Sequence, residues 1–262
     1  MKQIASAANP RYKALRALAQ SSQERRKTGL SVLDGVHLAS AYREHVGMPR
    51  SIAVSRSGLA NPEVRAVLET MRGVELLALS DALFGGLSSV ATPTGILAVV
   101  ETPRPRAAPQ GVDACVMLED LQDPGNLGSI LRSCAAAGVR HVWLSKGAVH
   151  AWSPRVLRAG MGAHFMLSLY EEADLLGLAR DFPGTLIATR ARAERTVFDA
   201  DLAGRVAFLF GNEGAGLSAA LLAAAHSVVS IPMPGGAESL NVAAAAAVCL
   251  FERVRQLRAA GG

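Results

Sequence analysis

Three glycine-containing turns carry most of the side chains in this sequence that could do chemistry. They are DPGNLGSILR at residues 123–132, LFGNEGAGL at 209–217 and IPMPGGAESLNV at 231–242. Each follows a run of residues typical of a strand and opens a run typical of a helix. Because open α/β folds place their ligands at the carboxyl edge of the sheet, the amide, carboxylate and guanidinium groups of these turns predict one shared binding site.

The third turn also has a purely structural interpretation. Ser239 and Asn241 stand directly before an alanine-rich run, and alanine is the strongest helix former. Short polar side chains commonly cap the unpaired N–H groups at a helix N-terminus. Taken alone, this turn is a helix cap, and only the other two turns favour a binding site.

The glycine spacing of the second turn excludes the common nucleotide-binding motifs. Residues 211–216 read G-x-x-G-x-G, whereas the dinucleotide fingerprint is G-x-G-x-x-G. The sequence also contains no P-loop, H-E-x-x-H helix or G-x-S-x-G elbow. A Rossmann-type oxidoreductase is therefore disfavoured. Glycine at such a turn suits a ligand that approaches the backbone closely without a pyrophosphate, such as S-adenosylmethionine.

Together the three turns resemble, in order and spacing, the signature motifs of the SpoU (TrmH-type) family of RNA ribose 2′-O-methyltransferases. The N-x-x-x-x-x-R spacing of the first family motif is met by Asn126 and Arg132. The resemblance spans residues 123–242. It implies transfer of a methyl group from S-adenosylmethionine to a ribose 2′-hydroxyl of structured RNA, with no metal ion.

The resemblance implies two groups of site residues, carried over by position in the motifs. The pocket for S-adenosylmethionine would be lined by Gly211, Ile231 and Leu240, with Met233 and Thr189 as neighbours. The catalytic group would be Asn126, Arg132, Glu213, Ser239 and Asn241. Without the resemblance, Ile231 and Leu240 would be interpreted as core residues.

Arg132 is the residue to which the resemblance gives the central catalytic role. A guanidinium is a poor base, because its pKa lies above about 12. Our hypothesis is that Arg132 clamps a phosphate of the target nucleotide and stabilises the nascent oxyanion, while that phosphate or a water accepts the proton. Glu213 would orient Arg132 or Asn126, and Ser239 and Asn241 would hold the ribose and the cofactor.

Strands and helices alternate in the first 105 residues, which we expect to form a small α/β domain. Expected strands lie at 30–33, 52–54, 74–79 and 96–100, and expected helices begin at Pro10, Val36, Pro62 and Asp81. The resemblance implies a substrate-binding domain shaped like ribosomal protein L30e, and residues 29–37 resemble its opening strand and turn. Ser31 and Asp34 depart from the apolar and glutamate positions expected there.

A proline-rich segment at about 101–112 predicts the linker to a second domain at 113–262. Expected strands lie at 114–118, 141–144, 165–169, 185–189, 205–210 and 228–231, and expected helices at 127–137, 154–160, 171–180, 217–225 and from 242 to about 257. This alternation predicts a mostly parallel sheet with helices on both faces. The resemblance implies a SPOUT fold with a deep trefoil knot, which pattern alone would not suggest.

All the excess positive charge lies in the N-terminal part of the chain. Residues 1–105 carry 13 Lys and Arg against 8 Asp and Glu, whereas residues 106–262 carry 14 of each. The charge is concentrated in the first 27 residues, which include Arg11, Lys13, Arg25, Arg26 and Lys27. We expect these five side chains to neutralise RNA phosphates, although a solvated basic helix explains the charge equally well.

The remaining composition narrows the class of protein. Cys115, Cys134 and Cys249 form no C-x-x-C pair, and the six histidines show no metal-ligand spacing. The N-terminus lacks the apolar segment of a signal peptide. The apolar run at 242–251 is shorter than the roughly 20 residues that span a bilayer. These features indicate a cytoplasmic protein without a membrane segment or a metal.

The resemblance further implies a homodimer with an active site built across two subunits. Ribosomal RNA is favoured over transfer RNA as the substrate, because an L30e-like domain suits ribosomal RNA. The alternatives are a transfer RNA 2′-O-methyltransferase and a non-catalytic RNA-binding or ribosome-assembly protein on the same fold. The residues do not separate a housekeeping enzyme from an antibiotic-resistance methylase.

Overall fold

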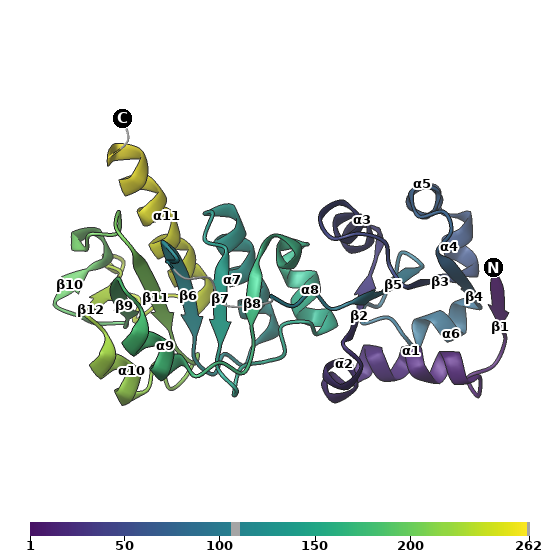
Figure 1. The fold of residues 1–262 in the computed structure, drawn as a ribbon, viewed down its shortest axis with the longest axis horizontal. Coiled ribbons are helices and arrows are strands. Elements are labelled where there is room, and N and C mark those ends of the chain that lie inside the picture. The colour runs from purple at the N-terminus through teal and green to yellow at the C-terminus, as the bar shows by residue number, and fades with distance from the viewer. Residues whose placement is uncertain (106–110, 261–262) are drawn as a thin grey trace. The chain divides into compact units, whose positions relative to one another are not determined.

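Within residues 1–105 and 111–260, which the computed structural model describes, the chain divides into two units (Figure 1). Unit 1 consists of Met1–Pro103 together with Trp152–Phe165, and unit 2 of the other described residues. Strand β5 of unit 1 extends to Glu101, so the proline-rich segment begins one residue later. Residues 106–110 of the expected linker lie outside the described residues.

Unit 1 contains a five-stranded mixed sheet in the order β1-β4-β3-β5-β2. The strands are β1 (Lys2–Ile4), β2 (Leu30–Asp34), β3 (Ser51–Ser55), β4 (Glu75–Leu79) and β5 (Ile96–Glu101). Strand β5 runs antiparallel to both β2 and β3, and the other pairs are parallel. Strand β1 was not predicted from the sequence, because a three-residue edge strand leaves too little alternation to detect.

Short polar side chains cap the helices of unit 1, except α3, which begins after Gly35. They are α1 (Pro10–Gln20), α2 (Ser22–Thr28), α3 (Val36–His45), α4 (Arg56–Ala60), α5 (Pro62–Thr70), α6 (Asp81–Gly85) and α8 (Pro154–Gly160). Asn9 and Ser80 accept hydrogen bonds from the first turns of α1 and α6, as their sequences predict. Helices α2 and α4 were not predicted, because their short sequences lack an apolar face at helical spacing.

Residues 152–165 belong to unit 1, although they lie far along the chain in the part that the sequence assigns to the C-terminal domain. His37 Nε2 lies 3.1 Å from the Met161 carbonyl oxygen. The Phe165 ring packs edge-on against Tyr42, with the ring centroids 5.4 Å apart. A domain boundary placed at one point of the sequence does not assign residues 152–165 to unit 1, because only tertiary contacts connect them to it.

Unit 2 contains a seven-stranded sheet in the order β10-β12-β9-β11-β6-β7-β8, with every neighbouring pair parallel. The strands are β6 (Ala114–Leu118), β7 (His141–Leu144), β8 (Ser168–Tyr170), β9 (Thr185–Thr189), β10 (Arg195–Thr196), β11 (Val206–Phe210) and β12 (Ser227–Ser230). The predicted mostly parallel α/β sheet is confirmed. The strand expected at 165–169 begins only at Ser168, because Ala163–Met166 forms a 3₁₀ turn.

Helices cover both faces of this sheet (Figure 1). They are α7 (Pro124–Ala136), α9 (Leu175–Asp181), α10 (Ala219–Ala224) and α11 (Val242–Ala260). Helix α7 packs against α11, and α9 packs against α10. Alternate strand residues such as Met117, Ala188 and Leu209 belong to the buried cluster under α9 and α10, together with Leu175 and Leu221. Because successive side chains of a strand point to opposite faces of the sheet, the same strands supply the core residues on both faces.

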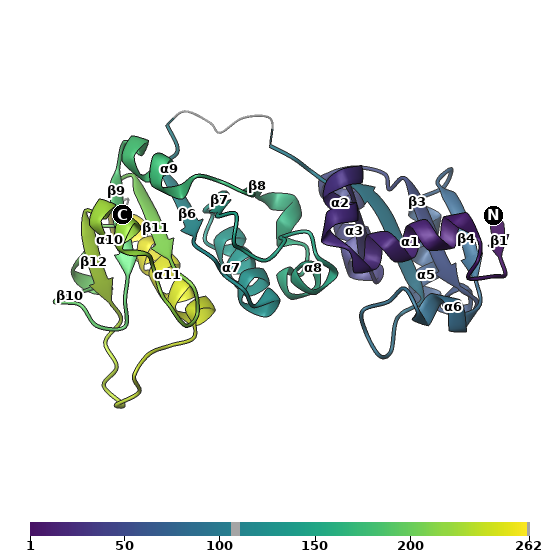
Figure 2. The same ribbon diagram turned by 90° about the horizontal axis from the view of Figure 1, so that it is seen from below.

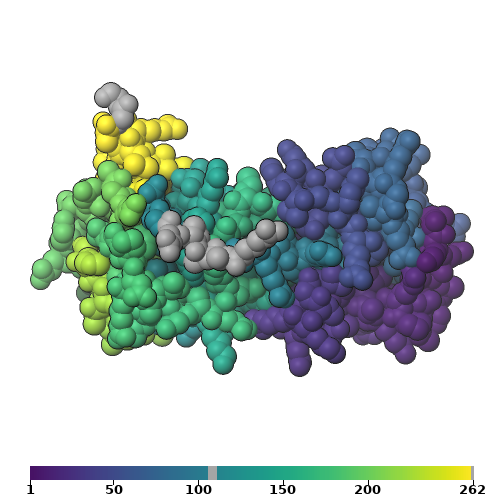
Figure 3. Space-filling view, in the orientation of Figure 1, coloured from purple at the N-terminus to yellow at the C-terminus, as the bar shows by residue number. Residues whose placement is uncertain are grey.

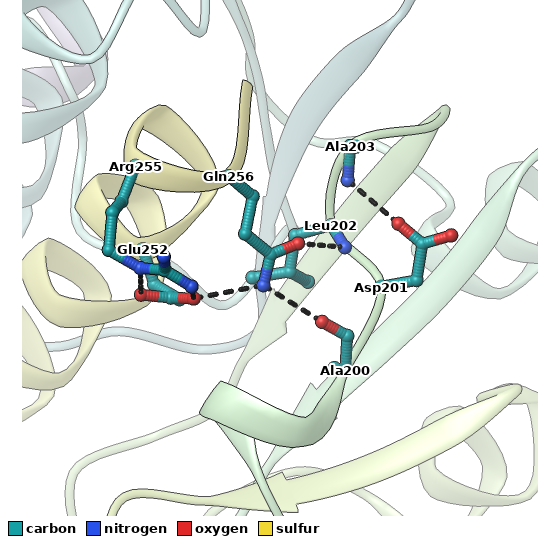
Figure 4. A network of polar contacts seen from close by, with 7 residues as sticks. All are labelled: Ala200, Asp201, Leu202, Ala203, Glu252, Arg255 and Gln256. Carbon is teal, nitrogen blue, oxygen red and sulfur yellow. Dashed lines mark hydrogen bonds and ion pairs between the residues drawn. The ribbon is translucent and has the colours of Figure 1, made fainter. Parts of the chain in front are cut away.

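The second half of α11 is fixed to the loop before β11 by a network of polar groups (Figure 4). Gln256 accepts a hydrogen bond from the Leu202 N–H at 2.8 Å and donates to the Ala200 carbonyl at 3.0 Å and to Glu252 at 2.9 Å. Arg253, which is buried, donates to the carbonyls of Leu202 and Gly204. These bonds satisfy loop carbonyls and a loop N–H that the sheet does not pair.

Candidate functional site

A pocket of about 610 Å³ opens at the carboxyl edge of the unit 2 sheet. Its walls come from the ends of β9, β11 and β12, the first turn of α7 and the N-terminal turns of α11. Figure 2 shows the 231–241 segment as a long loop that leaves β12 and returns to α11. The volume lies in the range of about 300–1,000 Å³ typical of small-molecule sites.

Glu213 joins the first two turns through hydrogen bonds. Its Oε1 accepts from the side-chain amide of Asn126 at 3.1 Å and from the Asp123 N–H at 3.0 Å. Its Oε2 accepts from the Gln122 N–H at 3.1 Å. The sequence suggested that Glu213 orients Arg132 or Asn126. The structure shows a hydrogen bond to Asn126 and none to Arg132 among the described residues.

The pKa of Glu213 lies below its ordinary value. Partial burial raises the pKa, but the hydrogen bonds from Asn126 and from the backbone N–H groups of Asp123 and Gln122 outweigh that effect. The carboxylate therefore stays ionised at neutral pH and acts as an acceptor only. This fixes the Asn126 amide with its NH₂ group toward Glu213 and its oxygen toward the third turn.

Asn241 completes the connection from the third turn. Its NH₂ group donates to Asn126 Oδ1 at 2.8 Å, and its own oxygen accepts from the Ala243 N–H at 2.9 Å. Asn241 therefore caps α11 and bonds the first turn at the same time. Ser239 lines the pocket two residues earlier and is exposed. Because α11 begins at Val242, Asn241 is the residue at the cap position.

Asn126 lies inside α7 rather than before it, which corrects the expected helix start at Leu127. Asp123 accepts the Asn126 N–H at 2.7 Å and caps the helix, with Pro124 in its first turn. Proline suits that position because the first helical N–H groups have no partner to lose. The cap holds Asn126 at a helix N-terminus, where its side chain faces the pocket.

Gly211 has a local reason to be glycine. A Cβ at this position would overlap the backbone of Gly216 and Leu217, because the 211–217 turn folds back on itself. The Asn212 N–H donates to the Gly216 carbonyl at 3.1 Å, and the Gly216 N–H donates to the Asn212 carbonyl at 2.9 Å. From the sequence this glycine was expected to allow close approach of a ligand, whereas the structure shows that the turn itself requires it.

The five residues proposed for the cofactor all line this pocket: Gly211, Ile231, Leu240, Met233 and Thr189. The Leu240 side chain is 39% exposed, which excludes a core role for it. Thr189 donates its hydroxyl to the Leu209 carbonyl at 3.1 Å, so it holds the β9 and β11 ends together. The pocket walls combine apolar side chains and glycines with amide groups, the ionised Glu213 and the exposed Arg190, which suits a ligand that joins a ring system to polar and charged groups.

Arg132 does not line the pocket. It lies on α7 six residues after Asn126, its side chain is exposed, and it forms no hydrogen bond or ion pair within the described residues. The structure therefore brings together four of the five proposed catalytic residues, Asn126, Glu213, Ser239 and Asn241, and leaves Arg132 outside.

The proposed RNA-binding residues of unit 1 differ in their surroundings. Lys13, Arg26 and Lys27 are exposed. Arg11 is exposed but pairs with Glu75 at 2.6 Å, and the hydrogen bonds from Arg11 and then Lys2 lower the pKa of Glu75 to about 2.

Arg25 does not belong with the proposed RNA-binding residues. Its side chain is only 4% exposed, and Nη1 donates to the Leu18 carbonyl at 2.6 Å. That carbonyl belongs to the last turn of α1, where carbonyls lack helical partners. Arg25 therefore closes the end of α1 and does not present its charge to RNA.

Two features of the site were missed from the sequence. Arg190, directly after β9, lines the pocket, and Asn212 holds the second turn by accepting the Gly214 and Ala215 N–H groups at 2.9 and 3.0 Å. Asn212 could have been found, since asparagine commonly bonds the backbone two residues on. An isolated arginine in a loop carries no comparable signal.

Among the described residues, no group of three or more His, Cys, Asp or Glu side chains is arranged to hold a metal ion. The three cysteines are free and buried, and burial raises the pKa of the Cys115 and Cys249 thiols to about 12. Over the same part of the chain, none of the helices has the length and apolar character needed to cross a membrane.

Comparison with known families gives two matches that divide the chain. Residues 113–251 match the model of the SpoU rRNA methylase family. This range includes all three turns of the pocket. Residues 9–98 match the model of an MRM3-like substrate-binding domain.

Individual relatives match over nearly the whole chain. An uncharacterized tRNA/rRNA methyltransferase of Synechocystis is 35% identical, covering 98% of this chain and 95% of its own. The 23S rRNA (guanosine(2553)-2′-O)-methyltransferase RlmP of Bacillus subtilis is 31% identical, covering 96% and 98%. The SpoU methyltransferase AviRb of Streptomyces viridochromogenes, solved with AdoMet, is 30% identical, with a TM-score of 0.83 and coverage of 96% and 100%.

Proposed function

The chain belongs to the SpoU rRNA methylase family, and we propose that it transfers a methyl group from S-adenosylmethionine to a ribose 2′-hydroxyl of ribosomal RNA. One observation carries the proposal: the three turns are joined around the pocket by the hydrogen bonds from Asn241 to Asn126 and from Asn126 to Glu213. Two relatives support the proposal: AviRb, which was solved in complex with AdoMet, and RlmP, which is named as a 2′-O-methyltransferase.

The proposed chemistry asks the protein mainly to position groups. S-adenosylmethionine supplies a methyl group on a sulfonium, so no further activation of the donor is needed. Gly211, Ile231 and Leu240, with Met233 and Thr189 beside them, would hold it. Orienting a ribose hydroxyl in line with that methyl group provides much of the rate enhancement.

Glu213 is a positioning residue in this scheme. Its two oxygens accept three N–H groups and its pKa is lowered, which makes it a weak base for a ribose hydroxyl. Asn126 and Asn241 present the amide groups that Glu213 orients, and Ser239 adds a hydroxyl at the pocket wall. The proton of the ribose hydroxyl passes to a substrate phosphate or a water.

We propose that the enzyme is a homodimer whose site is assembled across two subunits. Arg132 does not line the pocket of its own chain, although its motif position assigns it the role of stabilising the oxyanion. Phe251 and Leu257 on α11 are 48% and 42% exposed, and the end of this helix lies at the surface in Figure 3. In the proposed dimer a partner subunit covers this end of α11.

Unit 1 is proposed to bind the RNA as an L30e-like substrate domain, with unit 2 as the SPOUT catalytic domain that carries the trefoil knot. The match of residues 9–98 to a substrate-binding domain supports this division. Of the five basic residues proposed to bind RNA, Lys13, Arg26 and Lys27 are exposed and form no ion pair with Glu75, unlike Arg11. Because the matching relatives named above include a 23S rRNA enzyme, ribosomal RNA is favoured over transfer RNA, and the cytoplasm is the proposed compartment.

Isothermal titration calorimetry with S-adenosylmethionine tests the enzyme proposal, and mapping of 2′-O-methylated riboses in total RNA from a deletion strain tests the substrate. We expect binding of S-adenosylmethionine and the loss of one ribose methylation in ribosomal RNA. Absence of binding at millimolar ligand would contradict the proposed enzyme. Loss of a transfer RNA methylation instead would correct the substrate.

A further inference from the structure

Arg190 is the single positively charged residue among the described residues that line the pocket. It directly follows Thr189, the last residue of β9, and its side chain is exposed at the pocket wall. Its guanidinium forms no hydrogen bond or ion pair with the rest of the described chain. Glu213, the one carboxylate among the described pocket residues, accepts three N–H groups from other residues and forms no ion pair with Arg190.

The loop that carries Arg190 is held at both ends against β12. The Arg190 N–H donates to the Val229 carbonyl at 3.0 Å, which extends the pairing of β9 with β12 by one residue. The loop then returns as β10, where Arg195 and Thr196 pair with Val229 and Ser230. The backbone at Arg190 is therefore fixed beside the strand that leads into the third turn.

The buried Ser230 hydroxyl lies 3.4 Å from both the Ala193 and Arg195 carbonyls, which places it under the same loop. Ile231, one residue further, lines the pocket. The base of the Arg190 side chain is thus anchored to the segment that forms the pocket wall, while its charged end is free to meet a ligand at the opening.

We propose that Arg190 binds a backbone phosphate of the RNA next to the ribose that is methylated. This inference rests on the proposed function, because it concerns how the same site receives its substrate. A planar guanidinium pairs with phosphate through two parallel hydrogen bonds. Such contacts set the register of a nucleic acid without reading its sequence, which is what presenting one ribose to the pocket requires.

A phosphate fits Arg190 better than a carboxylate of the cofactor does. The side chain is exposed, and an exposed ion pair with one small carboxylate contributes little to affinity. A phosphate of a long RNA is already held near the pocket by the other contacts of the RNA. Its neutralisation also releases condensed counterions, which gives a favourable contribution that depends on salt.

The experiment compares Arg190→Ala with Arg180→Ala in the full-length protein. Arg180 is an exposed arginine near the end of α9, before β9 begins, so it lies toward the amino edge of the same sheet whereas Arg190 lies at the carboxyl edge. Both variants remove one exposed positive charge. Binding of an unmodified 23S rRNA transcript is measured by filter binding from about 50 to 200 mM salt, and binding of S-adenosylmethionine is measured by calorimetry.

For Arg190→Ala we expect roughly tenfold weaker RNA binding, with the slope of log affinity against log salt reduced by about 0.7–0.9. Its affinity for S-adenosylmethionine should stay within about twofold of the wild type, since no contact with the cofactor is lost. Arg190→Lys should keep the salt slope and lose part of the affinity, because lysine keeps the charge without the planar fork.

Three results would overturn the assignment of Arg190. An unchanged salt slope, equal to that of Arg180→Ala, would show that Arg190 neutralises no phosphate. A loss of affinity for S-adenosylmethionine with normal RNA binding would assign Arg190 to the carboxylate of the cofactor. Failure of the wild type itself to bind the transcript would remove the proposed substrate, and with it the inference.

Discussion

Unit 2 and unit 1 present their proposed functional side chains in different ways. In unit 2, Asn126, Glu213 and Asn241 come from three distant parts of the chain and are locked together by direct hydrogen bonds. In unit 1, the basic residues Lys13 and Lys27 lie exposed on separate helices. Methyl transfer requires fixed geometry, whereas nonspecific affinity for RNA requires mainly charge.

The largest effect is expected where the network of unit 2 is broken at its centre. Glu213→Gln keeps the shape but replaces an acceptor oxygen with an NH₂ group, so at least one of the donors at Asn126, Asp123 and Gln122 loses its partner. We expect the rate of methyl transfer to fall about 100-fold, in the range found when one preorganised group of an active site is lost.

The matched control is Glu238→Gln, which removes a carboxylate from the exposed part of the third turn and does not touch the pocket. Single-turnover transfer of a labelled methyl group to rRNA measures both variants. Equal rates for the two would contradict the idea that the network holds the catalytic geometry.

The next effect concerns the second turn. Gly211→Ala places a Cβ into the backbone of Gly216, so the turn must open. Overpacking of this kind costs about 1–3 kcal/mol, and we expect binding of S-adenosylmethionine to weaken by roughly 10- to 100-fold.

Gly214→Ala in the same turn is the control, because its added Cβ would meet only Asn212 Oδ1 at 3.6 Å. Calorimetry with S-adenosylmethionine should separate the two variants. Similar affinities for both would show that the shape of this turn does not decide cofactor binding.

A moderate effect is expected in unit 1 for Arg25→Ala, where a basic residue has a structural role. Its loss leaves the Leu18 carbonyl without the hydrogen bond from a charged donor, which we expect to lower the free energy of unfolding of the unit by about 1.5–3 kcal/mol. Thermal unfolding is compared with that of Lys27→Ala, an exposed basic residue on the same helix. A stability equal to that of Lys27→Ala would refute the structural role.

The smallest effect is expected for exposed cations of unit 1, such as Lys13. We expect Lys13→Ala to leave thermal unfolding unchanged and to reduce the salt slope of RNA binding by about 0.7–0.9. Filter binding over a series of salt concentrations measures the slope. An unchanged slope would remove Lys13 from the RNA surface, and a change in stability would give it a structural role as well.

Point variants test unit 1 better than deletion of the first 105 residues. Residues 152–165 belong to this unit, and their partners His37 and Tyr42 would be lost with the deletion. Phe165 would then lose the Tyr42 ring, against which it packs edge-on, and keep its contact with the Trp152 ring. Such a deletion would therefore disturb a segment inside the sequence that matches the SpoU model.

Most of the fold could be predicted because it depends on local pattern. The strands at Ala114–Leu118, His141–Leu144 and Thr185–Thr189 agree with the expected ranges, since buried apolar runs between turns identify parallel strands. The two-residue strand β10 and the helix α2 were missed. The first exists only through its pairing with β12, and the second has no apolar face.

The site was predictable as far as short motifs encode it. The turns around Asn126, Glu213 and Asn241 carry amides and glycines at recognisable spacing, and the structure brings them together. The burial of Arg25 was not predictable, because it depends on where the end of α1 lies in space. Arg190 was missed for the same reason, since only the pairing of β9 with β12 places it at the pocket.

The most direct test of the central claim is mass-spectrometric analysis of an unmodified 23S rRNA transcript after incubation with the purified protein and S-adenosylmethionine carrying a deuterated methyl group. We predict that the label appears on the 2′-oxygen of a single ribose, and that Glu213→Gln reduces the label strongly while Glu238→Gln does not. Label on a base, or no label with the wild type, would contradict the function proposed for the three turns.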